Sequence, residues 1–247
     1  MGVKAADFGI YKAQAVLFTP GASVRNHKIL AYLLSKWGDL FAGEPISLDL
    51  PAEALALGVP RVILKSEDSL TRLQVAHDRL DFFRHADNAC SLDASQHLAQ
   101  AIEIFNGYCK SMNIESTRVA AVVSRAADDD EPARTISRQF CREFWLDGPI
   151  NRPTEFEIHA LKSYQMGRTV SVNSWFRCKS GTLATGEEPN RTERRAVLVE
   201  QDLNTPNGEA RAPSLSPDTV REFFALATDE LDGTLGSYFP DPEALGR

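Results

Sequence analysis

The chain has 247 residues, a formal net charge of −7 and a pI near 5.3. Its 43% hydrophobic and 25% charged residues are typical of globular proteins and exclude a disordered or fibrous chain. The acidity argues against non-specific attraction of the whole molecule to phosphate backbones or anionic membranes. Residues 1–10 lack the apolar core of a secretory signal, and no stretch reaches the roughly 18 apolar residues of a membrane span. We therefore expect a cytoplasmic protein that does not enter a membrane.

The four cysteines are scattered through the chain without a CxxC pair. They are Cys90, Cys109, Cys141 and Cys178. Free, buried thiols in a reducing compartment are favoured over disulfides or a zinc site, because zinc ligands are usually closely spaced pairs.

The first half of the chain predicts a strand, a helix, three strands and a second helix. Residues 10–18 alternate as a strand does, and apolar residues recur at three and four over residues 29–41, as on one face of a helix. The tight His77-Asp78 turn joins the second and third of the later strands. The second helix opens at Ser91 or Asp93. The three later strands are expected at residues 61–65, 70–76 and 80–84.

The second half predicts the same order of elements. Arg118–Ser124 alternates as a strand, and Pro132 stands where the first residue of a helix would be. Ile136, Phe140 and Phe144 mark the apolar face of that helix. The closing helix begins with Ser216 as its N-cap. Three strands are expected between these helices, at residues 155–165, 169–179 and 195–203, with a polar excursion at residues 180–194 between the last two.

These patterns predict an α+β fold of two tandem strand-helix-three-strand-helix units. Residues 1–115 form the first half and residues 116–247 the second, and each has an antiparallel sheet covered by helices. The two halves are expected to form one compact unit, and the patterns leave open whether the two sheets join into one. Because each lies on the apolar stripe of an amphipathic helix, four aromatic side chains are expected to be largely buried. They are Trp37, Phe105, Phe140 and Phe224.

Three segments of the chain carry a resemblance to a known group of proteins. They are the strand pair Leu70–Phe83, the strand Ala196–Thr205 and the helix Phe223–Leu231. In layout, nearly the whole chain resembles an uncharacterised, sporadically distributed prokaryotic family of single proteins of about this length. A sporadic distribution implies mobile gene cassettes, such as phage defence or toxin-antitoxin modules. The resemblance supplies no site residues.

No motif in the sequence predicts catalysis, a metal or a cofactor. There is no GxGxxG, GxxxxGK[ST] or GxSxG run, and the five histidines show no HxH or HExxH spacing. His77-Asp78 is interpreted as a hairpin turn rather than an acid/base pair, because neighbouring strand residues point to opposite faces. Asp128 to Asp130 lack the spacing of a calcium loop and precede a helix, so they are interpreted as a solvated loop.

One pattern suggests binding. Arg134, Arg138 and Arg142 are spaced at i, i+4 and i+8, which on a continuous helix presents three guanidinium groups in one row. Like charges at this spacing repel one another, so the row is a candidate surface for an anion or an acidic partner. The alternative is a solvated face neutralised by residues 128–131. The polar excursion at Ser180–Arg194 is a second candidate surface, or otherwise a mobile loop.

Three functions remain open at this stage. The first, which we favour, is a non-enzymatic accessory or recognition protein that binds a protein partner encoded nearby, in a phage-defence or toxin-antitoxin system. The second is a nucleic-acid-associated protein with a clamp-like duplicated fold, an analogy at the level of fold only. The third is an enzyme of unfamiliar type whose site is assembled from dispersed residues.

Overall fold

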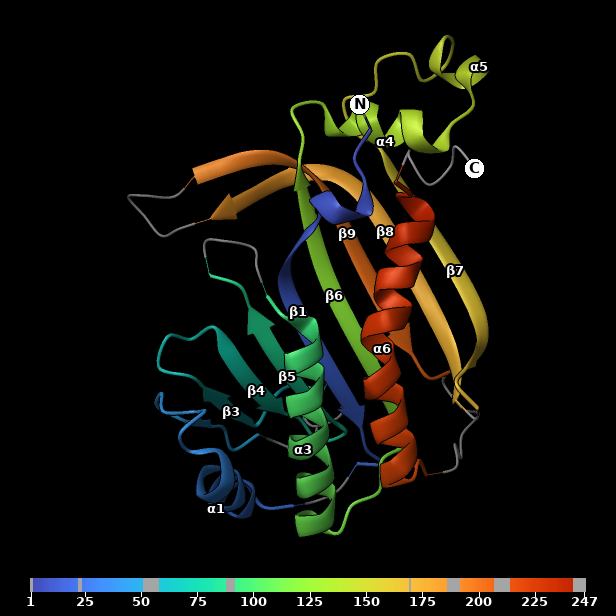
Figure 1. Ribbon diagram of the computed structural model, residues 1–247. Coiled ribbons are helices and arrows are strands. Elements are labelled where there is room, and N and C mark those ends of the chain that lie inside the picture. The colour runs from blue at the N-terminus through green and yellow to red at the C-terminus, as the bar shows by residue number, and fades with distance from the viewer. Residues whose placement is uncertain are drawn as a thin grey trace.

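One continuous antiparallel sheet forms the body of the protein (Figure 1). The computed structural model describes residues 2–21, 24–50, 58–87, 92–168, 170–185, 192–206 and 214–241. Within these ranges there are nine strands, in the order β2-β3-β4-β5-β1-β6-β9-β8-β7 across the sheet. Their bounds are β1 Gly9–Phe18, β2 Ile46–Ser47, β3 Val62–Lys65, β4 Thr71–Val75, β5 Arg79–His85, β6 Arg118–Asp128, β7 Glu157–Met166, β8 Val170–Thr185 and β9 Thr192–Asn204.

The expectation of two tandem units, each with its own helix-covered sheet, is wrong. Strands β1 and β6 pair with each other in the middle of the sheet, from Lys12 opposite Ser124 to Phe18 opposite Arg118. This pairing joins β5 on one side to β9 on the other, so residues 1–115 and 116–247 contribute to a single sheet. The pairing satisfies the backbone groups that β1 and β6 would otherwise expose as edge strands of two separate sheets.

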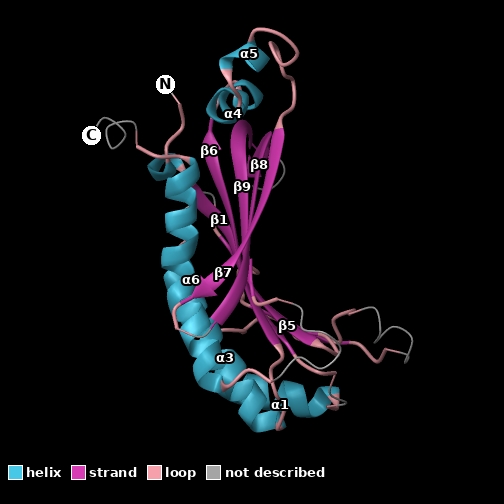
Figure 2. Cartoon of the chain, turned by 90° about the vertical axis from the view of Figure 1, so that its right-hand side faces the viewer, coloured by secondary structure: helices cyan, strands magenta, loops and turns pink. Residues whose placement is uncertain are grey.

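The helices that contact the sheet lie on one face of it (Figures 1 and 2). Helix α3 crosses β1 and β5, whereas α6 runs along β6, β8 and β9. The helices are α1 Asn26–Trp37, α3 Ala94–Met112, α4 Pro132–Phe140, α5 Glu143–Leu146 and α6 Pro217–Tyr238, with a 3-10 turn η1 at Ala5–Asp7. The predicted helix over residues 29–41 therefore begins and ends about one turn earlier than its apolar pattern indicated.

Local signals in the sequence set the ends of the two long helices. The side chain of Asp93 accepts hydrogen bonds from the backbone N–H groups of Ser95 and Gln96, so of the two predicted caps for α3 the structure uses Asp93. Helix α3 ends at Asn113, which adopts the left-handed conformation with φ 54°, a conformation that asparagine tolerates better than most residues. Ser216 caps α6 and Pro217 follows it, as predicted.

The larger apolar core lies between the sheet and helices α1, α3 and α6. Phe105 on α3 and Phe224 on α6 are 0% and 2% exposed, and their ring centroids lie 5.8 Å apart. Both are buried as predicted. Trp37 and Phe140 are only partly buried, and each is the last residue of its helix, where the apolar stripe ends.

A second, smaller core closes the far end of the sheet. Phe8, Phe176 and Phe239 pack there with Ile136 of α4, so the start of the chain, the sheet and the end of α6 share one apolar cluster. The ring of Phe176 stacks on that of Tyr238 with centroids 3.8 Å apart. This cluster fixes α4 at the end of the sheet.

The predicted polar excursion between the last two strands is wrong over most of its length. Strands β8 and β9 continue to pair from Ser180 opposite Val197 to Thr185 opposite Thr192, and residues 186–191 lie outside the described residues. The end of this hairpin lacks the apolar alternation that marks a half-buried strand, because neither of its faces is covered.

Candidate functional site

Helices α4 and α5 form a lobe beyond the end of the sheet, at the top of Figure 1. We call residues 132–146 the α4–α5 lobe. Its inner side is anchored by Ala133, Ile136 and Ser137, which are all buried. The Phe140 ring meets those of Tyr238 and Phe239 edge-on, with centroids 6.0 and 5.6 Å away. The lobe is therefore held firmly at its base while its outer side faces solvent.

The acidic run before α4 has a structural role. The carboxylate of Asp129 accepts hydrogen bonds from the backbone N–H of Glu131 and from the hydroxyl of Thr135, both at 2.7 Å. Asp128 forms an ion pair with Arg194 at 2.6 Å. These carboxylates order the loop that starts α4 and complement the positive end of its dipole.

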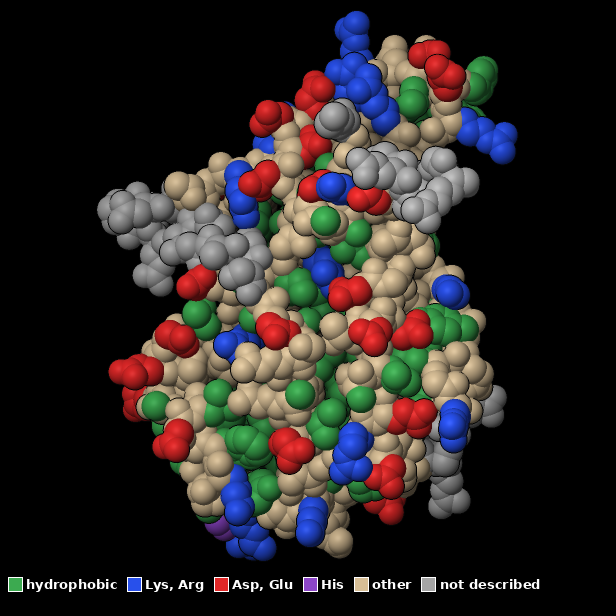
Figure 3. Space-filling model, in the orientation of Figure 1, with side chains coloured by type: hydrophobic (Ala, Val, Ile, Leu, Met, Phe, Trp, Pro, Cys, Tyr) green, Lys and Arg blue, Asp and Glu red, His purple; other side chains and the backbone are tan. Residues whose placement is uncertain are grey.

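The three predicted arginines all lie on the lobe and are all exposed, but they do not form one row along a helix. Helix α4 ends at Phe140, and Arg142 is the residue that precedes α5. Arg134 pairs with Glu131 at 3.0 Å. The lobe thus carries Arg134 and Arg138 on α4 and Arg142 just before α5, and both basic and acidic side chains surround it (Figure 3).

The most exposed aromatic side chains of the described residues lie in the same lobe as these arginines. Phe144 is 75% and Trp145 47% exposed, and no other aromatic residue appears among the exposed large hydrophobic side chains of the described chain. Their rings meet edge-on with centroids 5.6 Å apart. The sequence placed Phe144 on a buried stripe and overlooked Trp145. Their adjacency was no signal, because Phe223 and Phe224 on α6 are also neighbours and are 0% and 2% exposed.

A basic cavity of about 440 Å³ lies at the base of the lobe. Three arginines line it, Arg134, Arg152 and Arg195, against one acidic residue, Glu131. Guanidinium groups bind carboxylates and phosphates through paired hydrogen bonds. The lobe therefore carries an exposed aromatic pair and contributes Ala133 and Arg134 to a cationic cavity at its base.

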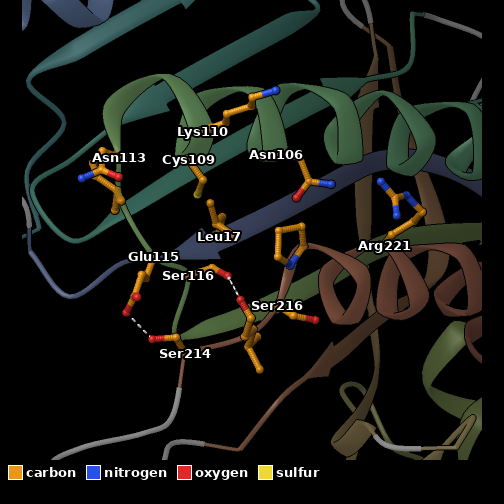
Figure 4. Close-up of a pocket in the computed structure, with 13 residues that line it drawn as sticks. Leu17, Asn106, Cys109, Lys110, Asn113, Glu115, Ser116, Ser214, Ser216 and Arg221 are labelled. Atoms are coloured by element: carbon orange, nitrogen blue, oxygen red, sulfur yellow. Dashed lines mark hydrogen bonds between the residues drawn. The ribbon is translucent and has the colours of Figure 1, made fainter.

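A larger cavity of about 860 Å³ lies between the end of α3 and the start of α6 (Figure 4). Leu17 and Cys109 are among its apolar lining, and Asn106, Lys110 and Arg221 are among its polar lining. A short bridge between the connecting segments closes one side, where Leu215 N–H donates to Ser116 O at 2.7 Å and Ser116 Oγ donates to Leu215 O at 3.1 Å.

The thiol in this larger cavity is not an activated nucleophile. Burial raises the pKa of Cys109 to about 11, so the group is protonated at neutral pH. Arg221 is paired with Asp218 at 2.6 Å. The cavity has room for a small molecule, but its protonated thiol does not suit an acyl-transfer reaction.

The histidines and acidic residues are dispersed. Among the described residues, no group of three or more His, Cys, Asp or Glu side chains is arranged to hold a metal ion. His77 and Asp78 lie in the turn between β4 and β5, as predicted. Cys109, Cys141 and Cys178 are free thiols, and Cys90 lies outside the described residues.

The chain matches no model of a known protein family, and no curated protein is significantly similar to it. None of the helices in the described ranges has the length and apolar character needed to cross a bilayer.

Proposed function

We propose that the protein is a recognition protein that binds an acidic protein partner through the α4–α5 lobe. The observation that carries the proposal is the exposed Phe144–Trp145 pair, which stands among Arg134, Arg138 and Arg142 on a lobe anchored only at its base. Soluble proteins seldom leave such a pair in water unless the surface is used.

The residue types on the lobe match those that dominate binding energy. Tryptophan and arginine are enriched among interface residues whose truncation costs the most, and aromatic anchors usually enter a pocket on the partner. Arginine adds paired hydrogen bonds to carboxylates. An acidic residue of the partner that enters the cavity between Arg134, Arg152 and Arg195 would be held by several guanidinium groups at once.

The charge distribution favours an acidic partner for this lobe. The whole chain carries a net charge of −7, whereas residues 132–146 contain three arginines and one acidic residue, Glu143. An acidic partner is therefore repelled less by the lobe than by the body of the protein, although Glu131 already pairs with Arg134. Such asymmetry orients the encounter and raises the association rate more than the final affinity. The resemblance to a sporadically distributed family supports a partner encoded nearby, and we place the interaction in the cytoplasm.

Replacing Arg134, Arg138 and Arg142 with alanine tests the charge component. We expect the variant to bind the product of an adjacent gene about tenfold more weakly, because each exposed charge pair contributes about 0.5 kcal/mol. The loss should shrink as the salt concentration rises. The melting temperature should hardly change, since all three side chains are exposed. Affinity is measured by calorimetry with the co-expressed partner.

A matched control removes three exposed cations from the other end of the molecule. Lys28 and Lys36 on α1 and Lys110 on α3 are exposed and lie outside the lobe. Their triple alanine variant should bind as the wild type does. Equal losses in the two variants would mean that net charge, rather than the lobe, governs binding.

A further inference from the structure

The face of the sheet opposite the helices carries a second candidate surface. The register of the paired strands shows which side chains lie on this face. Arg72 on β4 lies opposite Phe83, Phe83 opposite Gln14, and Gln14 opposite Val122. The residues of these strands that belong to the helix-packed core, such as Leu73, Phe82 and Ala15, alternate with them and so point the other way. In Figure 2 α3 and α6 stand on the opposite side of the sheet from this face.

One half of this open face is basic although the chain is acidic. We call it the basic half-face and define it by its cations and two aromatic rings. These are Lys12, Lys65, Arg72, Arg79 and Arg118 with Phe18 and Phe83, contributed by strands β1, β3, β4, β5 and β6. All five cations are partly exposed.

The acidic residues of the open face do not neutralise this half. Asp81 is buried and forms an ion pair with Arg79 at 2.9 Å. Glu200 lies on the other half and pairs with Arg177 at 2.6 Å. Asp202 lies on β9 opposite Val122 of β6, and its charge acts on Arg118. Lys12, Lys65 and Arg72 therefore remain as cations for an external anion, together with Arg118, whose charge Asp202 partly offsets.

Aromatic rings support three of these cations. The Arg72 guanidinium carbon lies 5.0 Å from the centroid of Phe83, and the Lys12 ammonium lies 5.6 Å from the same ring. Arg118 lies 4.7 Å from the centroid of Phe18. Its guanidinium also donates to Thr205 O at 2.9 Å and to Asn204 Oδ1 at 3.0 Å, both uncharged acceptors. The rings and these uncharged acceptors thus help to hold the charges in place.

The positive charges of the basic half-face also affect the neighbouring His85. His85 is two residues from Phe83 on β5 and lies opposite Lys12. Burial lowers its pKa, and the charges of Lys12 and Arg72 lower it further. Two cations are therefore close enough to disfavour a third positive charge at this place.

From this juxtaposition we propose that the basic half-face binds single-stranded nucleic acid. Guanidinium planes seated on aromatic rings offer stacking platforms for unpaired bases, and the surrounding cations contact the phosphates. The five strands from β3 to β6 span about 19 Å, at about 4.8 Å per strand spacing, which accommodates several nucleotides. A duplex hides its bases from such a platform. This inference is independent of the protein partner proposed for the lobe.

Binding is tested with a fluorescent oligo(dT) of about 20 nucleotides by anisotropy. If four phosphates are contacted, the affinity of the wild type should fall about 50-fold between about 50 and 200 mM salt. In the double variant Lys12→Ala, Arg72→Ala it should fall only about 7-fold, because two contacts remain. At about 50 mM salt the double variant should bind at least about tenfold more weakly than the wild type.

One variant distinguishes the contribution of stacking from that of charge. A control variant distinguishes binding at this face from binding elsewhere on the surface. Arg72→Lys keeps the charge but loses the planar group, so it should weaken oligo(dT) binding without changing the salt dependence. The control Lys36→Ala, Lys110→Ala removes two exposed cations from helices α1 and α3 and should bind oligo(dT) normally. Equal affinity for a matched duplex or for polyglutamate would overturn the assignment to single strands. No binding at about 50 mM salt, or an equal loss in the control, would overturn the site itself.

Discussion

Alanine at both Phe144 and Trp145 is expected to weaken binding of the partner by at least about 100-fold. The two rings are the most exposed aromatic side chains of the described residues, at 75% and 47%, and they contact each other edge-on. Truncation of an aromatic anchor typically costs about 2 kcal/mol or more, and tenfold in affinity corresponds to about 1.4 kcal/mol. The loss should appear mainly as faster dissociation, because the arginines that steer the encounter remain.

The same substitution should leave the fold intact, since neither ring belongs to an apolar cluster of the core. A control with comparable loss of exposed apolar surface is Leu34→Ala, Leu161→Ala, whose side chains are 37% and 50% exposed outside the lobe. Calorimetry with the co-expressed partner measures both variants. Unchanged affinity in the lobe variant, or a similar loss in the control, would remove the aromatic pair from the interface.

Lowering the pH from 7 to 5 is expected to destabilise the protein by about 2 kcal/mol through His97 alone. This residue of α3 is fully buried, stacks on Phe82 with centroids 4.4 Å apart and contacts Phe82 O through Nε2 at 3.1 Å. Because a carbonyl can only accept, the neutral ring carries its proton on Nε2. Burial lowers the pKa of His97 from 6.5 to about 4.

The lowered pKa of His97 determines that stability falls, rather than rises, as the pH is lowered. As the pH falls below 6.5, the unfolded chain takes up a proton at His97, whereas the folded protein does not until the pH approaches 4. Stability at this residue is therefore lost as the pH falls between these two values. Urea unfolding of the wild type and of His97→Gln at pH 7 and pH 5 measures the effect. The variant should lack about 2 kcal/mol of the wild-type pH dependence, and an identical dependence would show that His97 is protonated in the folded state.

Local structure was largely predictable from the sequence because its signals are local. Asp93 and Ser216 cap helices as their positions predicted, and Pro132 and Pro217 begin them. The alternation of apolar residues located most of the strands. These signals act within about four residues, so neighbouring sequence is sufficient to reveal them.

The arrangement of the strands was not predictable in this way. The pairing of β1 with β6 joins residues a hundred or more positions apart. Alternation shows which face of a strand is apolar but not which strand lies beside it. The basic half-face was missed for the same reason. Its cations are isolated in the sequence and become neighbours only through the register of five strands.

The arginine pattern located the lobe but gave it the wrong geometry. Spacing at four residues predicted one continuous helix from Arg134 to Arg142, whereas the backbone becomes extended at Cys141 and a new helix begins at Glu143. Contacts of Phe140 with Tyr238 and Phe239 hold the end of α4. These contacts involve residues about one hundred positions away, and no sequence pattern near Cys141 predicts them.

Site-specific photocrosslinking in cells tests the proposed docking surface most directly. A benzophenone amino acid in place of Phe144 should give one adduct of defined mass with the partner. The same group in place of Leu161, which is also half exposed, should give none, because β7 lies outside the lobe. Adducts of equal yield from both positions, or co-purification of the partner without any adduct from position 144, would contradict binding through the α4–α5 lobe.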